Sequence, residues 1–165
     1  KYAGRNESWQ LIIDYFKTKD IEDIPGILIY ILAHIPGHPD IAYYKDTLTK
    51  EAREFGKTQI ITFGKEQILK LLAFVDEDNM IARGTLGQSV EAIVSIIPNF
   101  IKFLEEIIKD NKIEIHLREV ASIIYAYHMG KDSIKLLKTI PKEESWYIPE
   151  LIKYLIKYEY LDLYG

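Results

Sequence analysis

Residues 100–130 read FIKFLEEIIK-DNK-IEIHLREVASIIYAYHM-G, and this stretch decides the class of fold. Apolar residues recur at helical three- and four-residue spacing on both sides of Asp110-Asn-Lys112. The polar tripeptide is a turn signal, and Gly130 is a residue at which helices commonly stop. The stretch therefore predicts two helices, Asn99–Lys109 and Ile113–Met129, joined by a short turn.

The same organisation extends outward along the chain. Each of the six prolines stands at an edge of an apolar helical pattern, and proline is accepted in the first turn of a helix but breaks its interior. Asp23 is a candidate cap for one helix, and Asp132 and Ser133 are candidate caps for another. The further helices that the pattern predicts are Glu7–Lys17, Asp23–Ile35, Asp40–Phe55, Lys65–Val75, Met80–Ile97, Asp132–Thr139 and Pro149–Tyr160.

Residues 56–64 carry the only local signal for a strand. Thr58-Gln-Ile-Ile-Thr-Phe63 is rich in β-branched residues. A single strand would have no partner in this chain, so we predict a loop or the start of a helix there.

A weak internal repeat accompanies these helices. The pentads that begin at Ile68, Phe100, Ser133 and Leu151 share an apolar pattern with lysine at the third position, and their starts are 32, 33 and 18 residues apart. The first two spacings suit a repeat built from a pair of helices, and the third does not. Arg83 and Arg118 stand 35 residues apart, each just inside the second helix of its pair.

A short apolar helix, an Asp/Asn turn and a second helix that opens with Arg before small and aliphatic residues resembles a HEAT repeat. Segments 65–97 and 99–129 carry the resemblance, while 7–55 and 132–165 fit only as irregular or truncated repeats. The resemblance implies an all-α superhelix, a stack of antiparallel helix pairs that acts as a binding scaffold. Each pair cannot bury its apolar face alone, so neighbours must stack. A globular helical bundle is the structural alternative.

The amino-acid composition excludes several classes of function. The chain of 165 residues has 21 basic and 25 acidic side chains and a net charge of −4, which gives no general attraction to nucleic acid. There is no cysteine, which excludes disulfides, thiolate metal sites and a cysteine nucleophile. No apolar run is long enough to span a bilayer, and the first ten residues do not resemble a signal peptide. We expect one intracellular, cytoplasmic domain over 1–165, taken from a longer protein.

Two surfaces are candidates for binding. Lys131, Lys135, Lys138 and Lys142 are spaced by four, three and four residues, as on one stripe of a helix, and such a stripe suits phosphates or an acidic partner. The ordinary alternative is a solvated helix face, and Pro141 ends the helix before Lys142.

The other candidate is the aromatic C-terminal end. Trp146, Tyr147, Tyr154 and Tyr158 are residue types favoured at protein interfaces, although an amphipathic stripe more often packs into a core.

A metal site is a weaker hypothesis. His34, His38 and Asp40 lie close in sequence, but Pro36 and Gly37 separate the two histidines, and zinc requires three or four convergent ligands. His116 and His128 are distant in sequence. The Asp76-Glu-Asp-Asn79 cluster lacks the spacing of a calcium loop and reads as a turn.

The sequence thus predicts a non-catalytic scaffold that binds another protein or the rest of its own chain, without cofactor, metal or membrane contact. The alternative is a nucleic-acid or phosphate binder that uses the lysines, and an enzyme built around His34 and His38 comes third.

Overall fold

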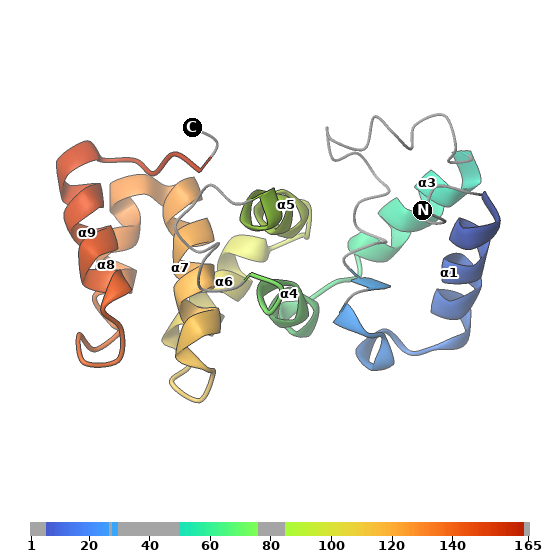
Figure 1. The fold of residues 1–165 in the computed structure, drawn as a ribbon, viewed down its shortest axis with the longest axis horizontal. Helices are drawn as coiled ribbons and strands as arrows, with labels where there is room; N and C mark the ends of the chain where they lie inside the picture. The colour runs from blue at the N-terminus through green and yellow to red at the C-terminus, as the bar shows by residue number, and fades with distance from the viewer. Residues whose placement is uncertain (1–5, 27, 30–49, 76–84, 164–165) are drawn as a thin grey trace. The chain divides into compact units, whose positions relative to one another are not determined.

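The computed structural model describes residues 6–26, 28–29, 50–75 and 85–163, and every regular element within these ranges is helical (Figure 1). The chain divides into two compact units. Unit 1 comprises Lys1–Leu71 and Ala92–Pro98, and unit 2 comprises Leu72–Glu91 and Asn99–Gly165. Among the described helices, none combines the length and the apolar character that crossing a membrane requires.

Unit 1 contains α1 (Asn6–Thr18), the 3-10 turn η1 (Ile21–Asp23), α3 (Lys50–Ile60) and α4 (Lys65–Leu72), whose last residue belongs to unit 2. Helices α1 and α3 pack together, and the ammonium group of Lys17 lies 5.6 Å from the ring centroid of Phe55. The core of this unit is aliphatic with two phenylalanines. Its buried residues include Ile13, Phe16, Ile24, Ile60, Phe63, Ile68 and Leu71.

Two side chains fix α4 within unit 1. The Gln67 side chain accepts a hydrogen bond of 2.8 Å from the backbone N–H of Gly64, which satisfies a donor at the start of the helix. Lys70 donates to the backbone carbonyls of Glu22 and Ile24, at 2.7 and 2.9 Å. These bonds join α4 to η1, which is far from it in sequence.

Unit 2 is built on a helical hairpin. Helix α6 (Phe100–Lys109) and helix α7 (Ile115–Met129) are joined by the Asp110–Glu114 turn and pack against each other. Helix α5 (Thr85–Val94) precedes them and continues past Glu91 into unit 1. Every residue of α7 from Arg118 to Ala126 is buried, so this helix is the centre of the unit.

Two further segments pack against α7. The 3-10 turn η3 (Gly130–Ser133) runs directly into the short α8 (Ile134–Leu137), and α9 (Tyr147–Tyr158) follows after a turn. Helix α9 contacts both α7 and α8, and Figure 1 shows the three helices as neighbours. Gly130 ends α7 with φ +55°, and a β-carbon there would lie 2.7 Å from the backbone oxygen of Glu159. Glycine at 130 therefore meets two requirements, a backbone angle and a close approach.

The prediction of an all-helical chain is confirmed for the described residues, and the hairpin over 99–129 is found within two residues of its expected bounds. The predicted helix end at Phe55 is wrong, because α3 continues through a buried Gly56 to Ile60. Thr58–Ile60 is thus the last turn of a helix. The segment that begins at Asp23 has a helical turn at Pro25, and its residues from 30 onward lie outside the described ranges.

The predicted capping role of Ser133 is also wrong. Ser133 has helical backbone angles and makes no capping bond to α8. Its hydroxyl instead donates 2.7 Å backward to the carbonyl of Gly130. Because η3 runs without interruption into α8, the N–H groups of the α8 first turn already have carbonyl partners in the preceding turn.

Candidate functional site

The clearest candidate surface of the described chain is the outward face of α9. Ile148, Leu151 and Leu155 recur at helical spacing and are buried. Glu150, Lys153 and Lys157 lie on the opposite side of the helix by the same spacing, and all three are exposed. The helix is therefore amphipathic, with one side committed to the core of unit 2.

Aromatic and aliphatic side chains flank that polar ridge. On and beside α9, Trp146 is 72% exposed, Ile156 64%, Tyr160 63%, Tyr158 44% and Tyr154 40%. The other large apolar side chains exposed in the described ranges are Leu11, Ile61 and Ile96, which are far apart in sequence. Isolated exposed apolar residues are normal, whereas a group of five on one helical segment indicates a contact surface.

Contacts within this face order its side chains. The rings of Tyr154 and Tyr158, one helical turn apart, have centroids 4.6 Å from each other. The ammonium group of Lys157 lies 4.8 Å from the Tyr158 centroid, in the range of a cation–π contact. Lys153 and Glu150 form an exposed ion pair of 2.6 Å. These neighbours restrict the rotamers of the two tyrosines, which lowers the entropy lost when a partner binds.

Tyr147 differs from the other aromatic residues singled out in the sequence. Its ring meets Trp146 edge-on, at a centroid distance of 5.7 Å, and is half-buried. Burial, with a smaller contribution from the negative charge of Glu119, raises the pKa of Tyr147 to about 12. Tyr147 therefore packs against Trp146 and is itself partly buried.

The start of α9 is held by two neighbouring charged residues of α7. Arg118 is 3% exposed; it donates through Nε to the carbonyl of Ile108 (3.0 Å) and through Nη1 to Glu144 (2.8 Å). Glu119 is 8% exposed and accepts a hydrogen bond from the hydroxyl of Ser145. Both bonds fix the segment immediately before Trp146.

The end of α9 is held separately. The backbone N–H of Lys131 donates 2.8 Å to the carbonyl of Glu159, and the two side chains form an exposed ion pair of 3.0 Å. The hydrogen bond to Glu159 raises the pKa of Lys131. Helix α9 is thus fixed at both ends, and its exposed face is presented on a rigid element.

The lysines predicted to form one helix stripe occupy different elements. Lys131 lies in η3, Lys135 in the short α8, Lys138 in the turn after it and Lys142 beyond Pro141. All four are exposed. The expected helix over 132–139 is shorter in the structure: η3 leads into α8, which ends at Leu137, so Lys138 and Lys142 lie beyond the helix that would carry the stripe.

The main candidate metal ligands fall in a part of the chain that the structure does not describe. His34, His38 and Asp40 lie outside the described residues, as do Arg83 and the Asp76–Asn79 turn. His128 bonds Glu91 at 2.8 Å, and His116 bonds the carbonyl of Val75. Within the described ranges, no group of three or more His, Cys, Asp or Glu side chains converges as metal ligands would.

Arg118 and Glu119 matter more to this surface than the sequence reasoning expected. Arg118 was noted for its position just inside a helix, and Glu119 was not singled out. Two charged residues in the middle of an otherwise apolar helix are a signal for buried partners, since unpaired buried charges are costly. The sequence therefore indicates that Arg118 and Glu119 have partners within the fold, although it does not identify Glu144 and Ser145 as those partners.

No protein-family model matches the chain, and no curated protein or solved structure is significantly similar to it. The likeness to HEAT repeats rests on the residues and spacings alone.

Proposed function

We propose that this chain is a non-catalytic helical module that binds another protein through the outward face of α9. The observation that carries the proposal is the group of exposed side chains Trp146, Tyr154, Ile156, Tyr158 and Tyr160 on one helical segment. A HEAT-like stacking of helix pairs forms part of the same proposal, because stacked pairs leave helix faces that a partner can cover.

The side-chain types suit a protein partner. Tryptophan and tyrosine carry much of the binding energy at protein interfaces, because each buries a large area while losing few rotamers. The hydroxyl groups of Tyr154 and Tyr158 also supply hydrogen-bond partners at the rim of such a contact. Rigid attachment of α9 at both ends favours binding without rearrangement.

The charges on the face indicate the chemistry of the partner. Lys153 and Lys157 stand among the aromatic residues, and Lys157 lies against the ring of Tyr158. A segment that crosses the polar ridge would place apolar side chains against Ile156 on one side and Tyr154 on the other, and its carboxylate would pair with Lys157 on the ridge. We therefore propose an apolar segment of another protein that carries acidic residues.

The lysine surface supports the alternative function less well. Lys131 is paired with Glu159, and the residues around Lys135 include Glu105 and Asp132. Carboxylates next to lysines repel phosphate groups, so affinity for a nucleic-acid backbone is reduced. Nucleic-acid binding through the lysines is therefore an alternative outcome of the binding experiment.

The test selects binding segments from a displayed peptide library with the full chain as bait, and then measures the selected segments by titration. Ile156→Ala and the double variant Tyr154→Ala/Tyr158→Ala should weaken binding about tenfold or more, the usual effect of removing a central contact. Ile61→Ala is the matched control, because Ile61 is 63% exposed and Ile156 is 64% exposed. Binding to the control should equal that of the parent chain.

Two results would contradict the proposal. One is selection of segments whose binding is unaffected by the α9 variants. The other is recovery of nucleic acid alone, released at high salt, which would make the lysines the site.

A further inference from the structure

A separate hollow of about 320 Å³ lies in unit 2, among α6, α7 and the η3–α8 segment. Its size is at the lower end of the range of small-molecule sites. No residue that forms it belongs to the α9 face. The hollow is lined by Glu105, Lys109, Tyr125, Asp132, Lys135, Leu136 and Thr139.

The inner wall combines an aromatic ring with a carboxylate. Tyr125 is only 5% exposed, and its hydroxyl donates 3.0 Å to Glu105, which is half-buried. A carboxylate has about four acceptor positions, and in the described chain this hydrogen bond uses one of them. Burial, followed by the bond to Glu105 and the charges of Glu105 and Asp132, raises the pKa of Tyr125 to about 12. The tyrosine is therefore a neutral hydrogen-bond donor, and Glu105 is the carboxylate of the wall.

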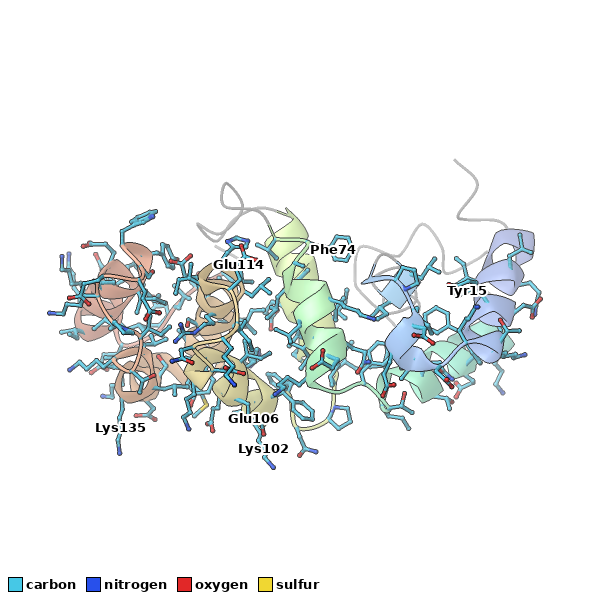
Figure 2. All side chains as sticks on the ribbon, turned by 90° about the horizontal axis from the view of Figure 1, so that it is seen from below. Tyr15, Phe74, Lys102, Glu106, Glu114 and Lys135 are labelled. Carbon is cyan, nitrogen blue, oxygen red and sulfur yellow. The ribbon has the colours of Figure 1, made fainter. Side chains whose placement is uncertain are left out.

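The exposed residues of the lining are two lysines, one aspartate (Asp132) and Thr139. Lys109 of α6 and Lys135 of α8 are both exposed, and Figure 2 shows Lys135 extending away from the ribbon. In the part of the chain that the structure describes, neither lysine lies within ion-pair distance of a carboxylate. Long lysine side chains line a hollow with their stems and keep their ammonium groups in water. The hollow thus has the Glu105 carboxylate on its inner wall, two lysines that outnumber Asp132 at its rim, and the apolar side chain of Leu136 in its lining.

We propose that this hollow binds a small zwitterion of the amino-acid class. The ammonium group of the ligand lies against Glu105 and the ring of Tyr125, its carboxylate faces Lys109 and Lys135, and its aliphatic part covers Leu136. Each end then gains a charge-assisted hydrogen bond, which is about twice as strong as a neutral one.

Charge balance favours a zwitterion over an anion. Two lysines and two carboxylates line the hollow, so an ion of either sign meets attraction at one end and repulsion at the other. Inorganic phosphate would meet Glu105 and Asp132, and a simple amine would meet the lysines. A molecule with both charges separated by a short chain avoids both conflicts.

The test titrates the full chain with 6-aminohexanoate and follows the NMR signals of Tyr125, Leu136 and Thr139. A ligand of this size should bind with a dissociation constant of about 1 mM. Hexanoate and hexylammonium each lack one charged end and should bind about tenfold more weakly. Glycine and β-alanine, measured alongside, report the preferred separation of the two charges.

Matched variants assign the contacts. Glu105→Gln and Lys109→Met should each weaken 6-aminohexanoate binding about tenfold. Lys102→Met is the control, because Lys102 is also exposed on α6, extends outward in Figure 2 and does not line the hollow. Circular dichroism of each variant confirms that α6 and α7 remain folded.

Three results would overturn the proposal. They are the absence of any signal shift at about tenfold the expected dissociation constant, equal binding of hexanoate and 6-aminohexanoate, and tighter binding of inorganic phosphate than of any zwitterion. The α9 variants leave this hollow intact, so its test is independent of the protein-binding proposal.

Discussion

Helices α7 and α9 each place some side chains where their residue type would not predict them. In α7 the charged residues Arg118 and Glu119 are buried and bonded, at 3% and 8% exposure. In and beside α9, the apolar residues Trp146 and Ile156 are exposed, at 72% and 64%. Residue type alone would assign the charged pair to the surface and the apolar pair to the core.

The difference follows from how much of each helix its neighbours cover: every residue of α7 from Arg118 to Ala126 is buried, whereas α9 has three buried residues. Helix α7 contacts α6, η3 and α9, so its polar groups must find partners inside the unit. Helix α9 contacts α7, α8 and η3, and the outer side of the helix is exposed in the described part of the chain. Polar groups in α7 are therefore structural, and apolar groups on the outer side of α9 are candidates for binding.

The largest expected effect is that of Arg118→Ala. The substitution leaves the Ile108 carbonyl without its donor and removes a packed side-chain stem, so the free energy of unfolding should fall by about 3 kcal/mol. Urea denaturation measures this change. Lys153→Ala removes an exposed ion pair and should change the same quantity by less than about 0.5 kcal/mol. Equal effects of the two variants would show that the comparison between the helices is wrong.

Gly130→Ala comes next. The φ of +55° and the approach of the Glu159 oxygen to 2.7 Å both oppose a β-carbon. We expect a loss of about 2 kcal/mol in the free energy of unfolding, seen as a lower midpoint of thermal unfolding. Lys131→Ala keeps the backbone bond to Glu159 and should cost less than about 0.5 kcal/mol. If Gly130→Ala were as stable as the parent chain, the end of α9 at Glu159 could move away from residue 130 without lowering the free energy of unfolding.

The pH dependence of stability tests how deeply Tyr147 is enclosed. The folded-state pKa of Tyr147, about 12, lies above the ordinary tyrosine pKa of about 10, so the neutral form stabilises the fold. This stabilisation is fully present below pH 10 and is lost as the pH rises toward 12. Absorbance titration of tyrosinate should show a late component, and Tyr147→Phe should reduce it. Since Tyr125 also ionises near pH 12, part of the late component remains.

The smallest effect on stability is expected from the exposed face itself. Trp146→Ala and Ile156→Ala should each change the free energy of unfolding by less than about 0.5 kcal/mol, because surface positions contribute little to folding. Urea denaturation of the two variants checks this. A loss above about 1 kcal/mol would show that these side chains stabilise the chain itself, and the binding proposal would fail.

Much of the fold could be predicted from the sequence because the apolar periodicity and the residues that end helices indicate the same helix bounds. Helices α6 and α7 combine apolar spacing, a polar turn at Asp110 and a stop at Gly130, so their bounds were nearly correct. The region of Gly56 was harder, because glycine there continues a helix instead of ending one.

The candidate site could be predicted only in part. Trp146, Tyr154 and Tyr158 were singled out as aromatic residues near the end of the chain, and their exposure depends on which side of α9 packs inward. The hollow around Tyr125 was not foreseen, because Glu105, Tyr125 and Lys135 belong to different elements and share no motif. Residues brought together only by packing give no local signal.

The bond between Lys131 and Glu159 closes a backbone loop that contains α8 and all of α9. A pull applied beyond Leu163, which is itself buried, would load that side chain and then this junction before it reached the core residues Leu151 and Leu155. Because the N–H of Lys131 and the carbonyl of Glu159 meet directly, the applied force would pass to the end of α7. Under such a load, α9 would separate from α7 and α8 only after the Lys131–Glu159 hydrogen bond had broken.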